Sequence, residues 1–190
     1  MKITNYNIIL GSNSPRRREI LSQMGIEFEV RVSDKEELYP ENLKEEEVSE
    51  FLAIQKANNL RNELQEDELL ITSDTIVLND GVILNKPKNE KEAKEMLQSL
   101  SAKTHKVITS VCLLSTEKIK FFSERTNVTF SKLSDEIIQF YIENYNPFDK
   151  AGSYGIQEWI GYIAVEKIEG SYNNVVGFPS SRVFNEIRNF

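Results

Sequence analysis

The stretch from Ile8 to Glu19 constrains the fold more than any other part of the chain. Its three apolar residues Ile8–Leu10 predict a short buried strand, and the small residues Gly11–Asn13 predict a turn after it. Ser14 is a favoured N-cap residue, and Pro15 is the type preferred at the first helical position. The stretch therefore predicts a strand, a tight turn and a helix start, as in an α/β protein.

Arginine occupies positions 16, 17 and 18, in the first turn of that helix. Cations there oppose the positive end of the helix dipole, at a cost of about 0.3–1 kcal/mol each. A bound anion would reverse the sign, because backbone N–H groups and guanidinium groups would both point at it. The alternative is that the arginines lie on the surface in salt bridges. We favour an anion site, because phosphate sites recur where a strand turns into a helix.

Composition limits the remaining possibilities. The 190 residues are enough for one domain or two small lobes, and the net charge of −7 argues against nucleic acid or an anionic membrane as a partner. One cysteine and one histidine exclude an intrachain disulfide and a His-rich zinc site. No apolar run approaches the roughly 18 residues of a membrane helix, and no signal peptide is expected, so the cytoplasm is the expected location.

Two charged residues interrupt apolar segments. Residues 45–64 predict a long helix whose apolar arc includes Lys56. A lysine there either extends to the edge of the arc or reaches into a cleft, and we favour the extended side chain. Residues 69–78 predict a strand buried on both faces, interrupted by Asp74. An unpaired buried carboxylate is costly, so Asp74 should be paired, bind a metal, or lie at a cleft.

The rest of the chain predicts alternating elements without repeats or a long linker. His105 is expected to be a hydrogen-bonded structural residue and Cys112 a small core residue. The predicted strands cover residues 26–32, 82–84, 104–115, 118–131 (one strand or two) and 159–168. The predicted helices begin at 89, 134 and 180. Residues 33–44 and 144–157 are predicted loops, and 170–179 is a loop or a strand end.

Neither a P-loop nor a dinucleotide-binding glycine motif is present, and the single histidine supports no nucleophilic triad. What remains is a set of cations with one interior carboxylate. Such a set suits phosphoryl chemistry, in which positioning and charge neutralisation dominate. Its members are Arg16, Arg17, Lys56, Lys86 and Asp74.

Several segments, in this order, resemble the Maf family of nucleoside triphosphate pyrophosphatases. Leu10–Leu21 resembles the family's LASxSPRRxxLL opening and Leu52–Ala57 its LAxxKA segment. Further matches are Ser73–Val77 with Asn85–Asn89 (ADTxV…xKPxd), Met96–Val107 (ML–LSG–THxV), Asp149–Gln157 and Gly170–Pro179. Glu158 and Trp159 follow Gln157 where a glycine is usual.

The resemblance implies an inosine triphosphate pyrophosphatase-like fold: a mixed β-sheet with flanking helices in two lobes around a cleft, as a single domain over residues 1–190. It implies hydrolysis of a nucleoside triphosphate to the monophosphate and pyrophosphate, with Mg²⁺ or Mn²⁺ and with a role in housecleaning of the nucleotide pool. The segment DKAGxYGIQ marks the branch that acts on dTTP and UTP. Asp74 aligns with the proposed proton acceptor, and Arg16, Thr75 and Gln157 align with specificity positions.

Our mechanistic hypothesis places the triphosphate against the helix start, where water attacks the α-phosphorus. Ser12, Arg16 and Arg17 hold the phosphates from one side, Lys56 and Lys86 from the other, and Gln157 reads the base. A divalent ion is held partly by Asp74 and by Glu37, and Asp74 is either its ligand or the general base. The alternatives are the same reaction on 7-methyl-GTP or another modified nucleotide, a nucleotide-binding regulator of septum formation, and a purely structural domain. A homodimer is left open.

Overall fold

The structure is a computed structural model that describes residues 3–35, 38–40 and 42–190. The chain divides into two compact units, and three long strands run from one unit into the other. The first unit comprises Met1–Asp74, Thr109–Glu124 and Gly177–Phe190, and the second comprises Thr75–Ile108 and Arg125–Val176.

The strands form one mixed sheet in the order β2-β1-β3-β5-β6-β7, with β4 paired to β3. Strand β1 is parallel to β2 and β3, whereas the β3–β4 and β6–β7 pairs are antiparallel. The strands are β1 (Asn7–Leu10), β2 (Phe28–Val30), β3 (Glu68–Asn79), β4 (Val82–Leu84), β5 (Thr104–Leu114), β6 (Ile119–Phe130) and β7 (Val165–Glu169). The predicted α/β fold with a mixed sheet and flanking helices in two units is confirmed, while a cleft stays a prediction.

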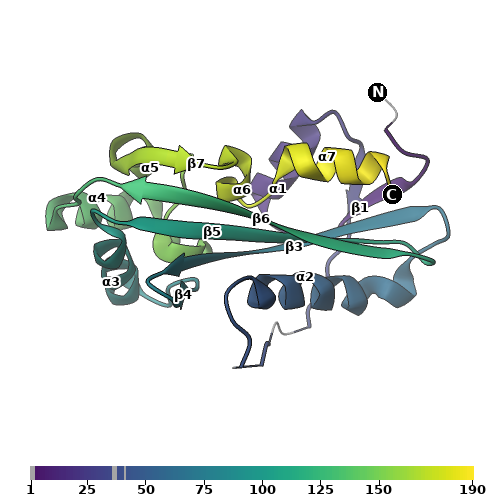
Figure 1. The fold of residues 1–190 in the computed structure, drawn as a ribbon, viewed down its shortest axis with the longest axis horizontal. Coiled ribbons are helices and arrows are strands. Elements are labelled where there is room, and N and C mark those ends of the chain that lie inside the picture. The colour runs from purple at the N-terminus through teal and green to yellow at the C-terminus, as the bar shows by residue number, and fades with distance from the viewer. Residues whose placement is uncertain (1–2, 36–37, 41) are drawn as a thin grey trace. The chain divides into compact units, whose positions relative to one another are not determined.

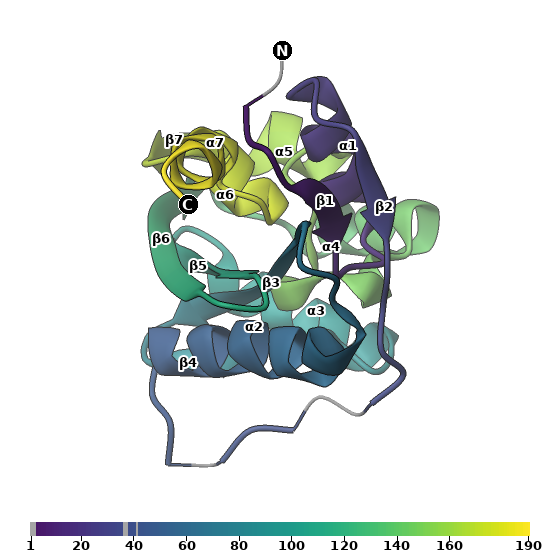
Figure 2. The same ribbon diagram turned by 90° about the vertical axis from the view of Figure 1, so that its right-hand side faces the viewer.

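In the first unit, helix α2 (Glu46–Leu60) covers one face of the strands, while α1 (Pro15–Gln23) and α7 (Ser180–Arg188) lie on the other (Figures 1 and 2). Buried residues of α2 pack against β1, β3 and β5 in an apolar cluster. The cluster comprises Ile9, Ala53, Ala57, Leu60, Leu70, Cys112 and Leu114. The apolar arc read from the sequence is therefore the face of α2 that packs on the sheet, and Cys112 is a core residue as predicted.

In the second unit, helix α3 (Glu90–Leu100) packs against α4 (Asp135–Tyr145). The side chains of Asn89 and Ser134 accept hydrogen bonds from backbone N–H groups in the first turns of these helices, as N-caps do. After α4 the chain makes the 3-10 turns η2 (Pro147–Asp149) and η3 (Ala151–Ser153), then α5 (Trp159–Ala164) and α6 (Tyr172–Val176). The 3-10 turn η1 (Arg61–Glu63) continues α2 in the first unit.

Two sequence-based assignments in the second unit are wrong. The predicted strand over 159–168 begins as helix α5, and only Val165–Glu169 is strand; the predicted loop or strand end over 170–179 contains helix α6. In helix α5, Gly161 lies directly over the carbonyl of Ile156, where a Cβ would lie 1.9 Å from that oxygen. Such short helices depend on tertiary packing more than on local propensity.

The loop predicted over residues 33–44 contains no regular element among its described positions. Within the described part of the chain, no helix is long and apolar enough to cross a membrane.

Candidate active site

The turn between β1 and α1 is built as the sequence predicted. The N–H of Gly11 bonds to the Ile71 carbonyl at 2.8 Å, and a Cβ at Gly11 would lie only 2.6 Å from Thr72 Cγ2. Ser14 is the N-cap residue of α1, but its side chain makes no capping bond, and no acidic residue lies in the first turn. The helix start thus lacks the usual internal anion or cap, which leaves its N–H groups suited to an external acceptor.

The guanidinium group of Arg17 forms hydrogen bonds to other residues of the protein. Its Nε donates to the Gly177 carbonyl at 3.0 Å, and its Nη1 donates to the Ser73 carbonyl at 2.8 Å and to Ser12 Oγ at 3.2 Å. One side chain therefore joins the loop after β1, the middle of β3 and the chain before α7. This planar fork holds three segments in register, a task that a point charge could not perform.

The neighbouring arginines differ from Arg17. Arg18 donates from Nη2 to Asn13 Oδ1 at 2.7 Å, and Arg16 is half-buried. Arg18 is also half-buried.

Asp74 is paired, which is one of the three outcomes expected for a carboxylate in β3. Its Oδ1 lies 2.6 Å from Lys56 Nζ, and only 14% of the Asp74 side chain and 17% of the Lys56 side chain are exposed. Lys56 Nζ also lies 3.5 Å from the Ser73 carbonyl. Because Arg17 donates to the same carbonyl, Arg17 and the Asp74–Lys56 pair are joined at Ser73. Lys56 therefore reaches inward, and the favoured interpretation, a side chain extended to the edge of the arc, is wrong.

The described residues contain no group of three or more His, Cys, Asp or Glu side chains placed to hold a metal. Glu37, the second predicted ligand, lies outside the described residues. A divalent ion that is bound by one carboxylate, with phosphate oxygens of a substrate completing its shell, needs no such group. Asp74 fits that mode as the one carboxylate, since its oxygens are the hard donors that Mg²⁺ and Mn²⁺ prefer.

The second unit carries the other predicted site residues. Thr75 follows Asp74 in β3, and Lys86 is exposed in the loop after β4. Gln157 is exposed at the third position of a turn closed by the Glu158 N–H and the Gly155 carbonyl at 3.0 Å. The roles of these three residues stay predictions.

Sequence reasoning passed over the residues that hold the Gln157 turn. The Tyr141 hydroxyl accepts from the Gly155 N–H at 3.0 Å and donates to Glu158 Oε2, while Glu158 Oε1 pairs with Lys150 Nζ at 3.0 Å. The signal available in the sequence was Gly155, because a Cβ there would lie 2.8 Å from Glu158 Cδ. Only glycine lets the carboxylate lie so close to the backbone.

His105 is a structural residue, as predicted. It is buried, its Nε2 lies 2.7 Å from the Tyr154 hydroxyl, and its ring meets Phe130 edge-on at 4.9 Å. Burial lowers the pKa of His105 to about 4, so the ring is neutral at physiological pH. The histidine thereby ties the start of β5 to the segment that leads to Gln157.

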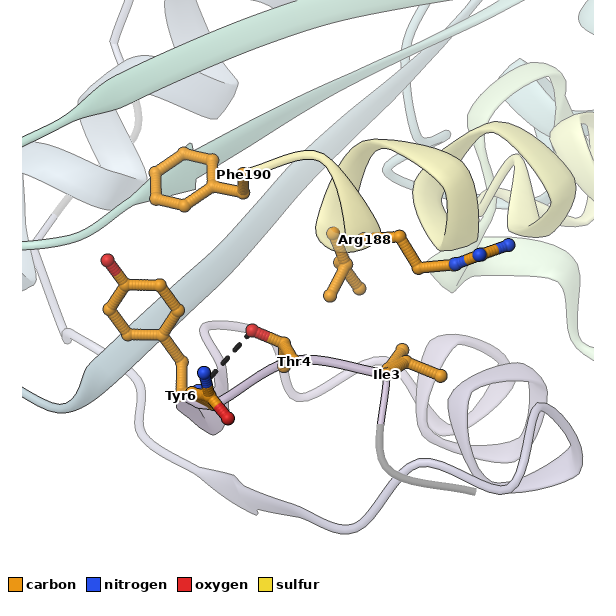
Figure 3. Close-up of a pocket in the computed structure, with 7 residues that line it drawn as sticks. Ile3, Thr4, Tyr6, Arg188 and Phe190 are labelled. Carbon is orange, nitrogen blue, oxygen red and sulfur yellow. Dashed lines mark hydrogen bonds between the residues drawn. The ribbon is translucent and has the colours of Figure 1, made fainter.

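A hollow at the two ends of the described chain contains none of these residues (Figure 3). It is lined by Ile3, Thr4, Asn5, Tyr6, Ile187, Arg188 and Phe190. Its hydrogen bond joins the Tyr6 N–H to Thr4 Oγ1 at 3.3 Å, and no titratable pair faces it among the residues drawn.

A basic helix start and a partly buried carboxylate–lysine pair, both on a mixed α/β sheet, are features expected of a protein that binds phosphate groups. Comparison with known proteins narrows this class. The profile of the family described as "Maf-like protein" matches residues 7–190, and the chain belongs to that family.

Among its relatives, proteins named "dTTP/UTP pyrophosphatase" are highly similar over nearly their full length. The one from Phocaeicola vulgatus is 54% identical over 187 residues, which is 98% of this chain and 97% of that protein. The one from Flavobacterium johnsoniae is 51% identical over 183 residues, which is 96% of this chain and 94% of that protein. Among solved structures, the Staphylococcus aureus Ham1 protein aligns with a TM-score of 0.48 at 13% identity, covering 95% of this chain and 99% of that one.

Proposed function

We propose that this protein hydrolyses dTTP and UTP to the monophosphate and pyrophosphate, with water attacking the α-phosphorus. The observation that carries the proposal is the joined polar set of the first unit, in which Arg17 and the Asp74–Lys56 pair meet at the Ser73 carbonyl. The names of relatives about half identical to this chain supply the substrate class.

In the first unit, each residue has a separate task. Ser12, Arg16 and the uncapped N–H groups of α1 bind phosphate oxygens, and Arg17 fixes the loop that carries them. Lys56 neutralises charge that develops on the phosphates, and Asp74 accepts a proton from the attacking water or holds a divalent ion with Glu37. When bound, Mg²⁺ or Mn²⁺ supplies charge neutralisation at the phosphate oxygens.

In the second unit, Lys86 provides a further cation for the phosphates, and Thr75 and Gln157 determine which base is accepted. The side-chain amide of Gln157 can both donate to and accept from a pyrimidine edge, which suits thymine and uracil. We propose that both units belong to one functional domain over residues 1–190, acting in the cytoplasm on the nucleotide pool.

Product analysis tests the reaction directly. The protein is incubated with dTTP or UTP and Mg²⁺ or Mn²⁺, and the products are separated by anion exchange. Pyrophosphate and a monophosphate are expected. Orthophosphate together with a diphosphate would place the attack at the γ-phosphorus and contradict the proposal.

A nucleotide panel tests the base. If 7-methyl-GTP or another modified nucleotide is the best substrate, the reaction stands and the base assignment is wrong. A nucleotide that binds but persists unhydrolysed would favour a regulator of cell division instead. Light scattering on the same sample determines whether the protein is a homodimer.

A further inference from the structure

The turn that carries Gln157 is fixed by a network of charged and phenolic side chains that the reaction does not use. Both oxygens of the Glu158 carboxylate are engaged: Oε2 accepts from the Tyr141 hydroxyl, and Oε1 pairs with Lys150 Nζ at 3.0 Å. Lys150 also binds Asp149 Oδ1 at 2.7 Å. The Lys150 side chain is only 9% exposed and the Glu158 side chain 25%, so the pair is partly shielded from water.

The network closes on the backbone of the turn itself. The Tyr141 hydroxyl receives the Gly155 N–H at 3.0 Å, so α4 is bonded to the first residue of the turn through the phenol and to its last residue through the carboxylate. Burial, and secondarily the bond to Glu158, raise the pKa of Tyr141, which keeps the phenol a donor to the carboxylate. The turn also has its own backbone bond from the Glu158 N–H to the Gly155 carbonyl at 3.0 Å.

Gln157 lies inside this closed ring of contacts but takes no part in it, and its side chain is exposed. Ile156, on the other side of the turn, is buried at 7% exposure and lies against Gly161 of α5. The backbone on both sides of Gln157 is therefore held, while the residue itself is exposed.

We propose that Glu158 is a positioning residue for Gln157: through Tyr141, Gly155 and Lys150 it holds the turn in one conformation and thereby sets the selectivity for the base. The inference rests on the proposed function, in which Gln157 reads the base. It goes further because it assigns base selectivity to a residue that has no part in the proposed reaction. A mobile turn would still present an amide, but would lose the orientation that distinguishes one pyrimidine edge from another.

The test uses Glu158→Gln, with Asp135→Asn as the matched control. Asp135 is an exposed carboxylate in the same unit, bonded to Gln98 and paired with Lys94 at 3.2 Å, and it does not contact the turn. kcat and KM are measured for dTTP, UTP, dCTP and dGTP by pyrophosphate release. For Glu158→Gln, KM for dTTP and UTP should rise about tenfold while kcat changes less than about threefold, so the preference over dCTP should fall about tenfold, a difference that corresponds to one lost hydrogen-bond contact. The control should match the wild type.

Two further measurements separate positioning from direct contact. Trp159 is the only tryptophan and packs on Phe140 with ring centroids 4.7 Å apart, so its fluorescence reports on this segment. Acrylamide quenching without nucleotide should increase in Glu158→Gln and not in Asp135→Asn. In a Gln157→Ala background, Glu158→Gln should change selectivity no further, because the side chain through which Glu158 acts has been removed.

The possible outcomes decide the inference. Lower selectivity with stronger quenching and no added effect in the Gln157→Ala background supports it. Unchanged selectivity overturns it, and so does lower selectivity with unchanged quenching, which would mean that Glu158 contacts the base itself. If Glu158→Gln does not fold, Tyr141→Phe carries the same test, since it removes only the hydroxyl. A wild-type protein that releases no pyrophosphate from any nucleotide would instead contradict the proposed function.

Discussion

The two units hold their predicted site residues by different means. In the first unit the charged groups fix one another: Arg17 binds the Ser12 hydroxyl, and Asp74 pairs with Lys56. In the second unit Gln157 is exposed, and residues without a role in the reaction hold its backbone. The residues of a phosphate site can hold one another in place through their own charges. An exposed side chain that reads a base must instead be held by other residues that fix its backbone.

The largest effect should follow from removing the carboxylate of the first unit. Asp74→Asn is expected to lower kcat by about 10³-fold or more, the range in which general bases contribute. The variant should still fold, with a lower melting temperature because a charge of a largely buried ion pair is removed. The amide keeps the size of the side chain but loses the charge facing Lys56. Pyrophosphate release and thermal unfolding are measured together, with the exposed Asp67→Asn as control. An active, folded Asp74→Asn would remove Asp74 from the mechanism.

The next test addresses the close contact between Gly161 and Ile156 in the second unit, next to the Gln157 turn. Alanine normally favours a helix over glycine by about 1 kcal/mol. At Gly161 of α5 the sign should reverse, because the added Cβ would lie 1.9 Å from the Ile156 carbonyl oxygen. We expect Gly161→Ala to lower the free energy of unfolding by about 3 kcal/mol. Urea denaturation measures this, and Ile163→Ala, at an exposed position on the same helix, should cost less than about 1 kcal/mol. Equal losses in the two variants would contradict the close fit.

Acid should distinguish the two units. The folded pKa of His105 is about 4, below its ordinary 6.5, so the protein favours the neutral ring. Its contribution to stability is complete above pH 6.5 and is lost as the pH falls towards 4. The difference between the two pKa values corresponds to about 3 kcal/mol of the free energy of unfolding. In the first unit, bidentate hydrogen bonds from Arg31 lower the pKa of Glu68, so that contribution is lost only below its ordinary 4.5.

Urea midpoints measured from pH 7.5 to 4.5 check this expectation. The wild type should lose stability through this range, whereas His105→Gln should show a flatter dependence because it does not titrate. A wild-type midpoint that stays constant down to pH 4.5 would mean that His105 is not held neutral.

The sequence predicts the first unit better than the second, for a physical reason. In the first unit the strand, the turn and the N-cap at Ser14 are local signals, and the residue types near Asp74 indicate phosphate chemistry. The partners of Arg17 could not be predicted, because two of them are main-chain carbonyls and carry no sequence signature. In the second unit, the assignment of residues 159–168 as strand failed because α5 depends on the fit of Gly161 against Ile156, a contact made in three dimensions.

A substitution at Arg17 tests whether this cation binds phosphate or holds the segments of the first unit together. Lysine cannot reach both the Gly177 and the Ser73 carbonyls, so Arg17→Lys should lower the free energy of unfolding by about 2 kcal/mol and kcat/KM by about tenfold. Arg18→Lys, which loses only the bond to Asn13, should change both by much less. A rise in KM without any loss of stability in Arg17→Lys would mean that Arg17 binds phosphate and does not act as a clamp.

The smallest effect tests how far the polar character of the first unit extends. Ser73 supplies its carbonyl to Arg17 and Lys56, but its own Oγ is buried and has no hydrogen-bond partner among the described residues. Burying an unpaired hydroxyl is unfavourable, so Ser73→Ala should stabilise the protein by up to about 1 kcal/mol and leave kcat and KM within about twofold. The carbonyl contacts remain in the variant because they belong to the backbone. A clear loss of activity in Ser73→Ala would show that the hydroxyl itself contacts the substrate. The Ser73 side chain would then belong to the site together with Arg17, Lys56 and Asp74.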